Sequence, residues 1–226
     1  MRFAFAVTLA CAAAFLGACS GGTSSFYPAA PDAASLAPGQ MSVSVEAQAP
    51  FDFAAHQYNV VFNTSGNGST PASDRSQPNW SAYSYALIAG GDGKTTAGPV
   101  AFVRGRGAHA PAIVPLQAKP SQFVFDPNSD ETGNEYRITF ARSLLGRGGA
   151  LPHVGNLWRF NVIVSKPNLH DAGFSYVSGI APCRACFVSP KLDVTQPFDV
   201  VEYVRLAPRT GDPSTQIVRV EIANRP

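Results

Sequence analysis

The chain has 226 residues, of which 45% are hydrophobic and 14% charged, and its formal net charge at pH 7 is +2. The charged fraction is well below the ~25% usual for soluble domains, and no run of Lys and Arg occurs, so the composition argues against a nucleic-acid partner. The 20 glycines and 19 prolines are spread along the chain and disfavour long helices, which tolerate neither residue.

The chain opens with the pattern of an export signal. Arg2 is followed by an apolar stretch from Phe3 to Leu16, shorter than the roughly 20 apolar residues that a membrane-spanning helix needs. Leu16-Gly17-Ala18-Cys19 closes the stretch and resembles the bacterial lipobox. That resemblance implies that residues 1–18 are removed and that a diacylglyceryl group is attached to Cys19. An ordinary secretory signal without lipid is the alternative interpretation.

Residues 19–40 are interpreted as a lipidated N-terminus and a flexible tether, because Gly, Ser, Ala and Pro dominate and no periodicity appears. Two or more acyl chains on one residue suffice for stable anchoring, so membrane lipid is the first expected partner. Ser20 stands where an aspartate would resemble an inner-membrane retention signal. We therefore expect a lipid-anchored protein of the cell envelope, with the outer membrane or the cell surface favoured.

From Met41 the sequence alternates between apolar and polar residues. Val43 and Val45 alternate with serines, and Tyr58, Val60 and Phe62 continue the period of two. Similar short runs, each bounded by turn-forming residues, recur to the end of the chain. They predict one all-β domain over residues 41–226, a single antiparallel sandwich of the immunoglobulin-like or jelly-roll-like type with roughly ten to twelve strands. Ser143-Leu144-Leu145, ended by Gly146, is the only predicted helical turn.

Trp80, Tyr83 and Tyr85 follow a long polar loop and are the candidate ligand-binding residues. Their rings would provide a stacking surface where this loop meets a strand. The alternative interpretation is that Trp80 closes one end of the core and that Tyr83 and Tyr85 share one face of a strand.

Asp126, Asn128 and Asp130 are spaced like the first ligands of a calcium loop. The expected glycine at the sixth position and glutamate at the twelfth are missing, so the site would be weak. Turn formation by the same residue types is the favoured interpretation. Structural calcium is the one cofactor that we consider.

Two later segments resemble a known family. Glu135 to Gly146 is a strand that runs into a short turn, and Asn156-Leu-Trp-Arg-Phe-Asn-Val-Ile-Val-Ser165 is a second strand after a Gly/Pro loop. Together with Tyr58 to Gly68 they resemble the family 9 carbohydrate-binding modules and their DOMON-type relatives. The resemblance implies a β-sandwich that binds sugars or, in some branches, haem. Haem-binding members use Met and His ligands, and Met41 is the only Met left after signal removal.

Cys183 and Cys186 are the cysteines that remain for the folded domain. In an oxidising compartment a local disulfide is the default. Free thiols and a redox or metal role stay open as alternatives. A c-type haem would need His after the second cysteine, where Phe187 stands.

No nucleophile elbow, HExxH motif or phosphate loop occurs, and no pair of carboxylates stands out. We therefore expect a non-enzymatic surface lipoprotein whose sandwich binds a ligand, with carbohydrate favoured. The alternative is a structural or assembly subunit of an envelope complex that binds protein partners. A secreted hydrolase is the third possibility.

Overall fold

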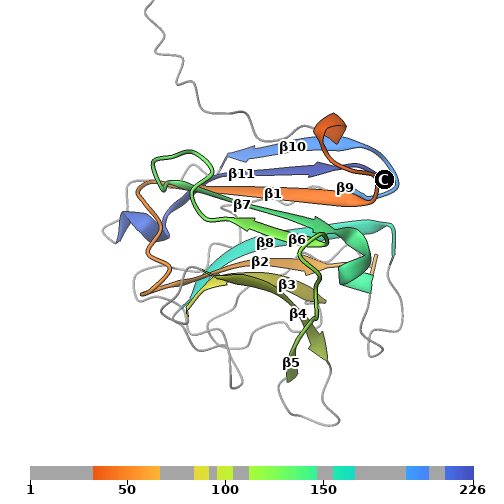
Figure 1. Cartoon of the computed structure of the whole chain (residues 1–226), viewed down its shortest axis with the longest axis horizontal. Helices are drawn as coiled ribbons and strands as arrows, with labels where there is room; N and C mark the ends of the chain where they lie inside the picture. The colour runs from red at the N-terminus through yellow and green to blue at the C-terminus, as the bar shows by residue number, and fades with distance from the viewer. Residues whose placement is uncertain are drawn as a thin grey trace, which may run out of the picture.

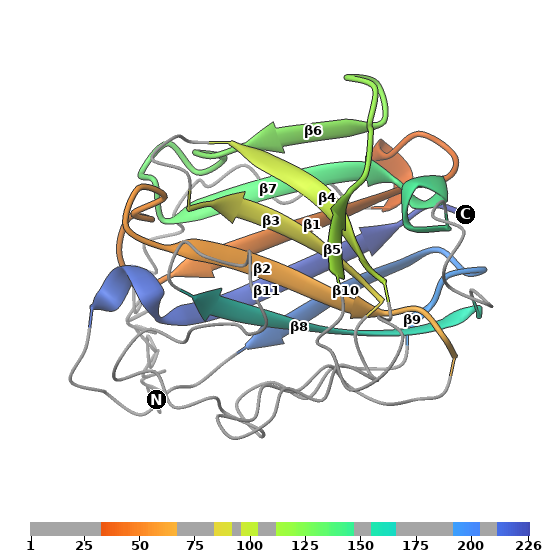
Figure 2. The ribbon, with the colours of Figure 1, turned by 90° about the horizontal axis from the view of Figure 1, so that it is seen from below.

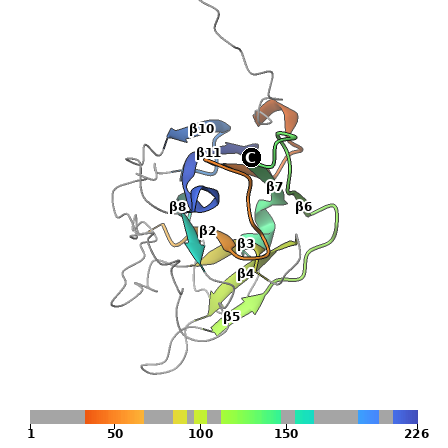
Figure 3. The ribbon, with the colours of Figure 1, turned by 90° about the vertical axis from the view of Figure 1, so that its left-hand side faces the viewer.

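The structure is a computed structural model, and it describes residues 33–66, 84–91, 96–103, 112–146, 155–165, 192–203 and 212–226. These residues form eleven strands in two antiparallel sheets of 5 and 6 strands, packed as a sandwich. The all-β sandwich predicted from the alternating pattern is thus confirmed. Figure 1 shows the two layers from the side, and Figure 3 shows them end-on.

The five-stranded sheet has β1 at its centre. Its order is β10 (Phe198–Tyr203), β11 (Ile217–Asn224), β1 (Gln40–Ala47), β7 (Glu135–Ala141) and β6 (Phe123–Asp126).

The six-stranded sheet has β3 and β2 at its centre and is the nearer layer in Figure 2. Its order is β5 (Ala112–Pro115), β4 (Ala97–Val103), β3 (Tyr85–Gly90), β2 (Gln57–Asn63), β8 (Leu157–Ser165) and β9 (Leu192–Asp193).

The core lies between the sheets because successive side chains of a strand point to opposite faces. Its largest fully buried members include aromatic residues of four strands: Tyr58, Phe62, Tyr85, Tyr136, Phe140 and Phe160. Met41, Val43 and Val45 of β1 fill the same layer. Trp158 of β8 also belongs to the core, since it is 2% exposed and meets Phe62 edge-on with ring centroids 6.0 Å apart. Met41, the methionine that a haem ligand would require, is fully buried among these side chains.

Three short 3-10 helices occur among the described residues: η1 (Ala33–Ser35), η3 (Arg142–Gly146) and η4 (Pro213–Thr215). The predicted turn at Ser143-Leu144-Leu145 is η3, and it buries both leucines against the core. The other two helices were not predicted. In η4, Asp212 accepts a hydrogen bond from the Ser214 amide, which caps the first turn.

Strand direction gives the sandwich two distinct ends. The pairings Met41↔Phe140, Met41↔Asn224 and Asn63↔Arg159 show which strand ends meet. We call one end of the sandwich the loop end. The strands that finish there are β2, β4, β7 and β11, and those that begin there are β1, β3, β6, β8 and β10. The carbonyl of Val194 joins the two layers here, since it accepts hydrogen bonds from Arg142 and Asn224. The loop end lies at the right of Figure 1, beside the C-terminus. The opposite end, which carries η4, is called the far end.

The segment before β1 is joined to the loop end. Leu36 is buried, the Arg225 guanidinium donates to the Ala34 and Leu36 carbonyls, and the Gly39 amide donates to the Arg225 carbonyl at 2.8 Å. Residues 33–39, which the sequence assigned to the tether, therefore contact the sandwich. No helix among the residues that the structure describes is long and apolar enough to cross a membrane. The predicted signal peptide and Cys19 lie outside the described residues.

Candidate functional site

Three polar connections of the sandwich begin and end at the loop end. β2 finishes at Asn63 and β3 begins at Tyr85, so the intervening segment starts and finishes on this side of the sandwich. The connections from β4 to β5 and from η3 to β8 do the same. Because ligand-binding residues in sandwiches commonly sit on clustered loops, the loop end is the candidate functional site.

Hydrogen bonds fix the first residues of these connections. Asn63 is buried, and its Oδ1 accepts from the Ser65 amide at 3.0 Å and from the Ser65 hydroxyl at 2.7 Å. The Thr64 amide donates to Ser84 Oγ at 3.1 Å, which ties the start of the connection to its end. The asparagine oxygen is used to form the turn, which is the role that short polar side chains commonly have after strands.

The entry to β8 packs against the same turn. The Gly155 amide donates to the Thr64 carbonyl at 2.7 Å, and Trp158 Nε1 donates to the Gly155 carbonyl at 2.8 Å. A Cβ at Gly155 would lie 2.9 Å from the Gly66 Cα, so the two backbones approach as closely as only glycine permits. The loop end thus has a rigid frame under the connections that start there.

The three aromatic residues predicted to bind a ligand do not share one environment. Trp80 and Tyr83 lie outside the described residues. Tyr85 is fully buried in β3, and burial raises the pKa of its phenol. Tyr85 therefore belongs to the core, and its assignment to a ligand-stacking surface is corrected. The alternation of β3 points its first side chain inward, because Leu87 two residues later packs in the same core.

The calcium loop predicted at Asp126, Asn128 and Asp130 is a hydrogen-bonded turn. Asp126 Oδ1 accepts from the Asn128 amide at 3.2 Å, whereas Asp130 accepts from the Thr132 and Gly133 amides and from the Thr132 hydroxyl. Burial alone would raise the pKa of Asp130, but these hydrogen bonds lower it. Among the described residues, no three His, Cys, Asp or Glu side chains form a group that could hold a metal ion. These contacts agree with turn formation, the favoured interpretation of the spacing, because the Asp126 and Asp130 oxygens already accept hydrogen bonds within the turn.

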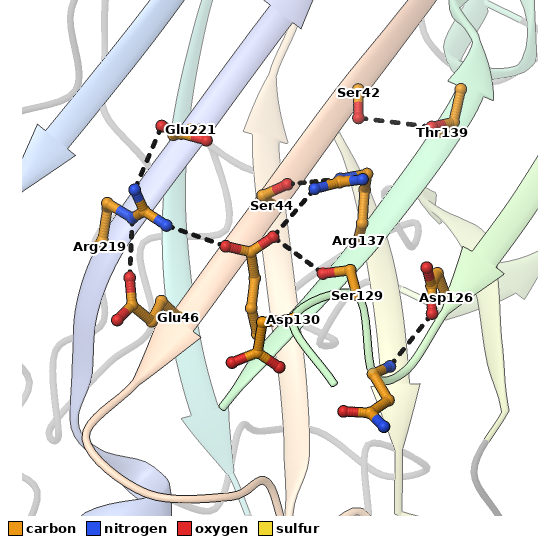
Figure 4. Close-up of polar contacts among 12 residues, drawn as sticks. Ser42, Ser44, Glu46, Asp126, Ser129, Asp130, Arg137, Thr139, Arg219 and Glu221 are labelled. Atoms are coloured by element: carbon orange, nitrogen blue, oxygen red, sulfur yellow. Dashed lines mark hydrogen bonds and ion pairs between the residues drawn. The ribbon is translucent and has the colours of Figure 1, made fainter. Parts of the chain in front are cut away.

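A cluster of charged side chains covers the outer face of the five-stranded sheet, and the sequence reasoning missed it (Figure 4). We call it the charged ladder: Glu46, Glu135, Arg137, Arg219 and Glu221, from β1, β7 and β11. Glu135 is the centre of the ladder. Its Oε1 accepts from Ser129 at 2.8 Å and from Arg137 at 3.1 Å, and its Oε2 accepts from Arg219 at 3.0 Å.

Arg219 joins the three carboxylates of the ladder. It lies 2.7 Å from Glu46, 3.0 Å from Glu135 and 3.5 Å from Glu221. Burial opposes its charge, but the carboxylates prevail and raise the pKa of Arg219. Burial raises the pKa of Glu221, and the neighbouring glutamates add to that effect while the arginines oppose it. Glu221 Oε2 has no hydrogen-bond partner, so this carboxylate is the least compensated of the three.

A second ionic contact lies at the far end. His56 Nε2 is 2.9 Å from Asp212 Oδ2, and the hydrogen bond from His56 is the main cause that lowers the pKa of Asp212. Tyr58 stands behind this pair and donates its hydroxyl to the Ser214 carbonyl at 3.2 Å. The contact fastens η4 to the start of β2 and is structural in its geometry.

The remaining candidate residues, Cys183 and Cys186, also lie outside the described residues. Alternation places Glu46, Arg137, Arg219 and Glu221 on the polar phase of their strands, but it does not show that they meet. The pairing of β1 with both β7 and β11 was the missing information, because it brings residues some 170 positions apart into one cluster.

Comparison with known proteins gave no relationship for this chain. No family model matches it, and neither curated proteins nor solved structures gave a match. The resemblance to family 9 carbohydrate-binding modules therefore rests on the sequence segments alone.

Proposed function

We propose that this protein is a lipid-anchored envelope protein that holds a ligand at the loop end of its sandwich and does not transform it. Carbohydrate is the favoured ligand. The observation that carries the proposal is the rigid frame of Asn63, Ser84, Gly155 and Trp158 at the base of three polar connections, one of which contains Trp80 and Tyr83. Binding proteins need such a frame to hold loop residues in position.

The carbohydrate proposal depends on aromatic residues in one of these connections. An aromatic face matches the C–H face of a pyranose ring, and Trp80 and Tyr83 are the candidates that remain after Tyr85 is assigned to the core. The resemblance of the β7–η3 and β8 segments to sugar-binding modules agrees with the same ligand class.

The charged ladder supports a hydrolytic role less well than the loop end supports ligand binding. A glycosidase needs one carboxylic acid and one carboxylate on either side of a bound sugar. Glu46 and Glu135 are directly paired across β1 and β7, but Arg219 contacts both of them. The Arg219 guanidinium, 2.7 Å from Glu46 and 3.0 Å from Glu135, thus occupies the hydrogen-bonding positions of both carboxyl groups that a bound sugar would need.

An assembly subunit is the second candidate, and the open edge of β6 favours it. The Ala141 amide donates to the Gln122 carbonyl at 2.8 Å, so Val124 is also in a hydrogen-bonded pair with β7. The main-chain groups of Phe123 and Phe125 then point away from the sheet, where a strand from a partner could add. For this candidate we expect Val124→Lys to abolish binding of an envelope protein without changing any response to sugars.

A screen of sugars by thermal shift, with a glycan array alongside, tests the favoured proposal. The protein is the chain from position 19 with Cys19→Ser, compared with the same chain carrying Trp80→Ala. Tyr85→Phe serves as the matched aromatic control, since it keeps the buried ring. We expect a sugar-dependent rise in melting temperature that Trp80→Ala removes and Tyr85→Phe retains. A response that survives Trp80→Ala, or the absence of any sugar response, would overturn the carbohydrate proposal.

A further inference from the structure

Basic side chains collect at the loop end. Lys119 precedes β6, Arg142 follows β7, Arg159 pairs with Asn63, and Arg225 follows β11. They outnumber the carboxylates of that end among the described residues, which are Asp193 and Asp199. Arg142 and Arg225 donate to backbone carbonyls and form no ion pair with a carboxylate among the described residues, and Lys119 is exposed.

The rest of the described sandwich has the opposite charge. Its carboxylates are balanced only in part by Arg137 and Arg219 of the charged ladder. They belong to the far end and to the middle of the five-stranded sheet: Glu46, Asp52, Asp126, Asp130, Glu131, Glu135, Asp212 and Glu221. Within the part of the chain that the structure describes, charge is therefore polarised along the strands, with the positive side at the loop end.

Exposed apolar side chains are found in the same half of the sandwich. The large hydrophobic residues that are most exposed among those described are Val114 (42%), Val124 (53%) and Leu157 (40%). Val114 pairs with Ala101 beside Tyr85, Val124 pairs with Thr139 near the start of β1, and Leu157 begins β8. Basic and apolar side chains at one end of a molecule are the combination that binds a lipid interface.

We propose that the loop end lies against an anionic phospholipid surface, with the acidic far end directed away from it. The inference rests on the proposed lipid anchor at Cys19, because the chain enters the sandwich at this end, where the Ala33 amide donates to Asp199 and Arg225 donates to the Ala34 carbonyl. The segment between Cys19 and Ala33 can span at most about 45 Å, at ~3.5 Å per residue. Attraction between the basic loop end and the lipid would then set the orientation of the sandwich on the membrane. A sugar bound at the loop end would in that case be a sugar carried at the lipid surface.

Vesicle binding by the unlipidated chain tests whether the loop end binds anionic lipid, separately from whether Cys19 is acylated. The chain from position 19 with Cys19→Ser is floated with vesicles of phosphatidylcholine alone or mixed with phosphatidylglycerol, at about 10 mM salt, where the Debye length is ~30 Å. Lys119→Gln and Gln48→Glu each lower the net charge by one, at the loop end and the far end respectively, and both side chains are exposed. We expect binding only to the anionic vesicles, weakened about fivefold by Lys119→Gln and unchanged by Gln48→Glu.

Two results would overturn the proposal. One is equal or absent binding to the two kinds of vesicle at this low salt concentration. The other is an equal loss of binding for Lys119→Gln and Gln48→Glu, which would show that net charge and not the loop end is responsible. Neither result bears on acylation of Cys19, which is measured independently by the mass of the native N-terminus.

Discussion

Buried tyrosine hydroxyls in the core differ in whether the fold gives them a partner. Tyr58 donates to the Ser214 carbonyl and accepts from the Asp52 amide, and burial raises its pKa to about 12. The Tyr85 hydroxyl is buried without any hydrogen-bond partner. A buried hydroxyl without a partner loses its hydration and gains nothing in return.

Tyr58→Phe and Tyr85→Phe should therefore have different effects on stability. We expect Tyr58→Phe to lower the free energy of unfolding by about 1–2 kcal/mol, because two backbone groups lose their partner. Tyr85→Phe should leave it within about 0.5 kcal/mol or raise it. Urea unfolding of both variants measures this, and a large loss for Tyr85→Phe would show that its hydroxyl has a role that the core assignment does not explain.

The glutamates of the charged ladder also differ in how far hydrogen bonds and guanidinium groups compensate the burial of their carboxylates. Glu135 is nearly fully buried and has donors from Ser129, Arg137 and Arg219, whereas Glu221 has one weak contact. We expect Glu135→Gln to lower the free energy of unfolding by about 2–3 kcal/mol. The loss is somewhat smaller than for a fully buried ion pair because the guanidiniums of Arg137 and Arg219 remain partly hydrated. Glu221→Gln, the matched control, should cost far less. Equal losses in denaturant unfolding would contradict the central place of Glu135.

Glu221 also predicts a pH dependence. Its pKa is raised in the folded protein, so ionisation is harder there than in the unfolded chain. Its contribution to stability is therefore largest below the ordinary glutamate pKa and is lost as the pH rises through the raised value. Glu221→Gln has no such loss. We expect the free energy of unfolding of the variant relative to the native chain to increase from pH 4 to pH 7, and a decrease over that range would refute the assignment.

At the scale of elements, most strands could be predicted from alternation because each apolar phase faces one core. The strand predicted within Glu135–Gly146 is β7, and that predicted within Asn156–Ser165 is β8. The two-residue β9 is too short for any periodicity to appear. Asn59 and Val61 of β2 are fully buried although they occupy the phase opposite the core, so the outer face of the six-stranded sheet is covered there. A single strand's pattern contains no information about what covers its second face.

The end of β3 depends on a glycine. Gly90 has φ of +76°, and a Cβ there would lie 2.8 Å from the carbonyl oxygens of Phe53 and His56. We expect Gly90→Ala to destabilise the protein by at least about 2 kcal/mol, from the left-handed conformation and the steric clash together. Gly98→Ala in the neighbouring β4 is the control, since a Cβ there meets nothing within 4 Å. Thermal unfolding of the pair tests this, and a tolerated Gly90→Ala would contradict the turn geometry.

For the whole molecule, the sequence predicted the sandwich but only part of the candidate site. Tyr85 and the Asp126–Asp130 turn had composition typical of a binding site, yet one packs in the core and the other caps its own backbone. Local residue types cannot separate these roles, because aromatic rings and short carboxylates serve structure and binding equally well. The gathering of the described basic side chains at the loop end depends on strand order, which no local pattern specifies.

The proposed function depends on where the chain is held. A lipid anchor on the chain before Ala33 would place the loop end toward the membrane. The charged ladder would then lie farther from the point where the chain is anchored. Without an anchor, the basic and apolar residues of the loop end would need another partner.

Intact-mass spectrometry of the native protein, purified from the membrane fraction of its host, tests this claim most directly. We expect a mature chain that begins at Cys19 and carries the mass of a diacylglyceryl group, with or without a further acyl chain on its amino group. A chain that begins at another residue, or one that begins at Cys19 with no acyl mass, would contradict the claim that a lipid holds this sandwich at a membrane.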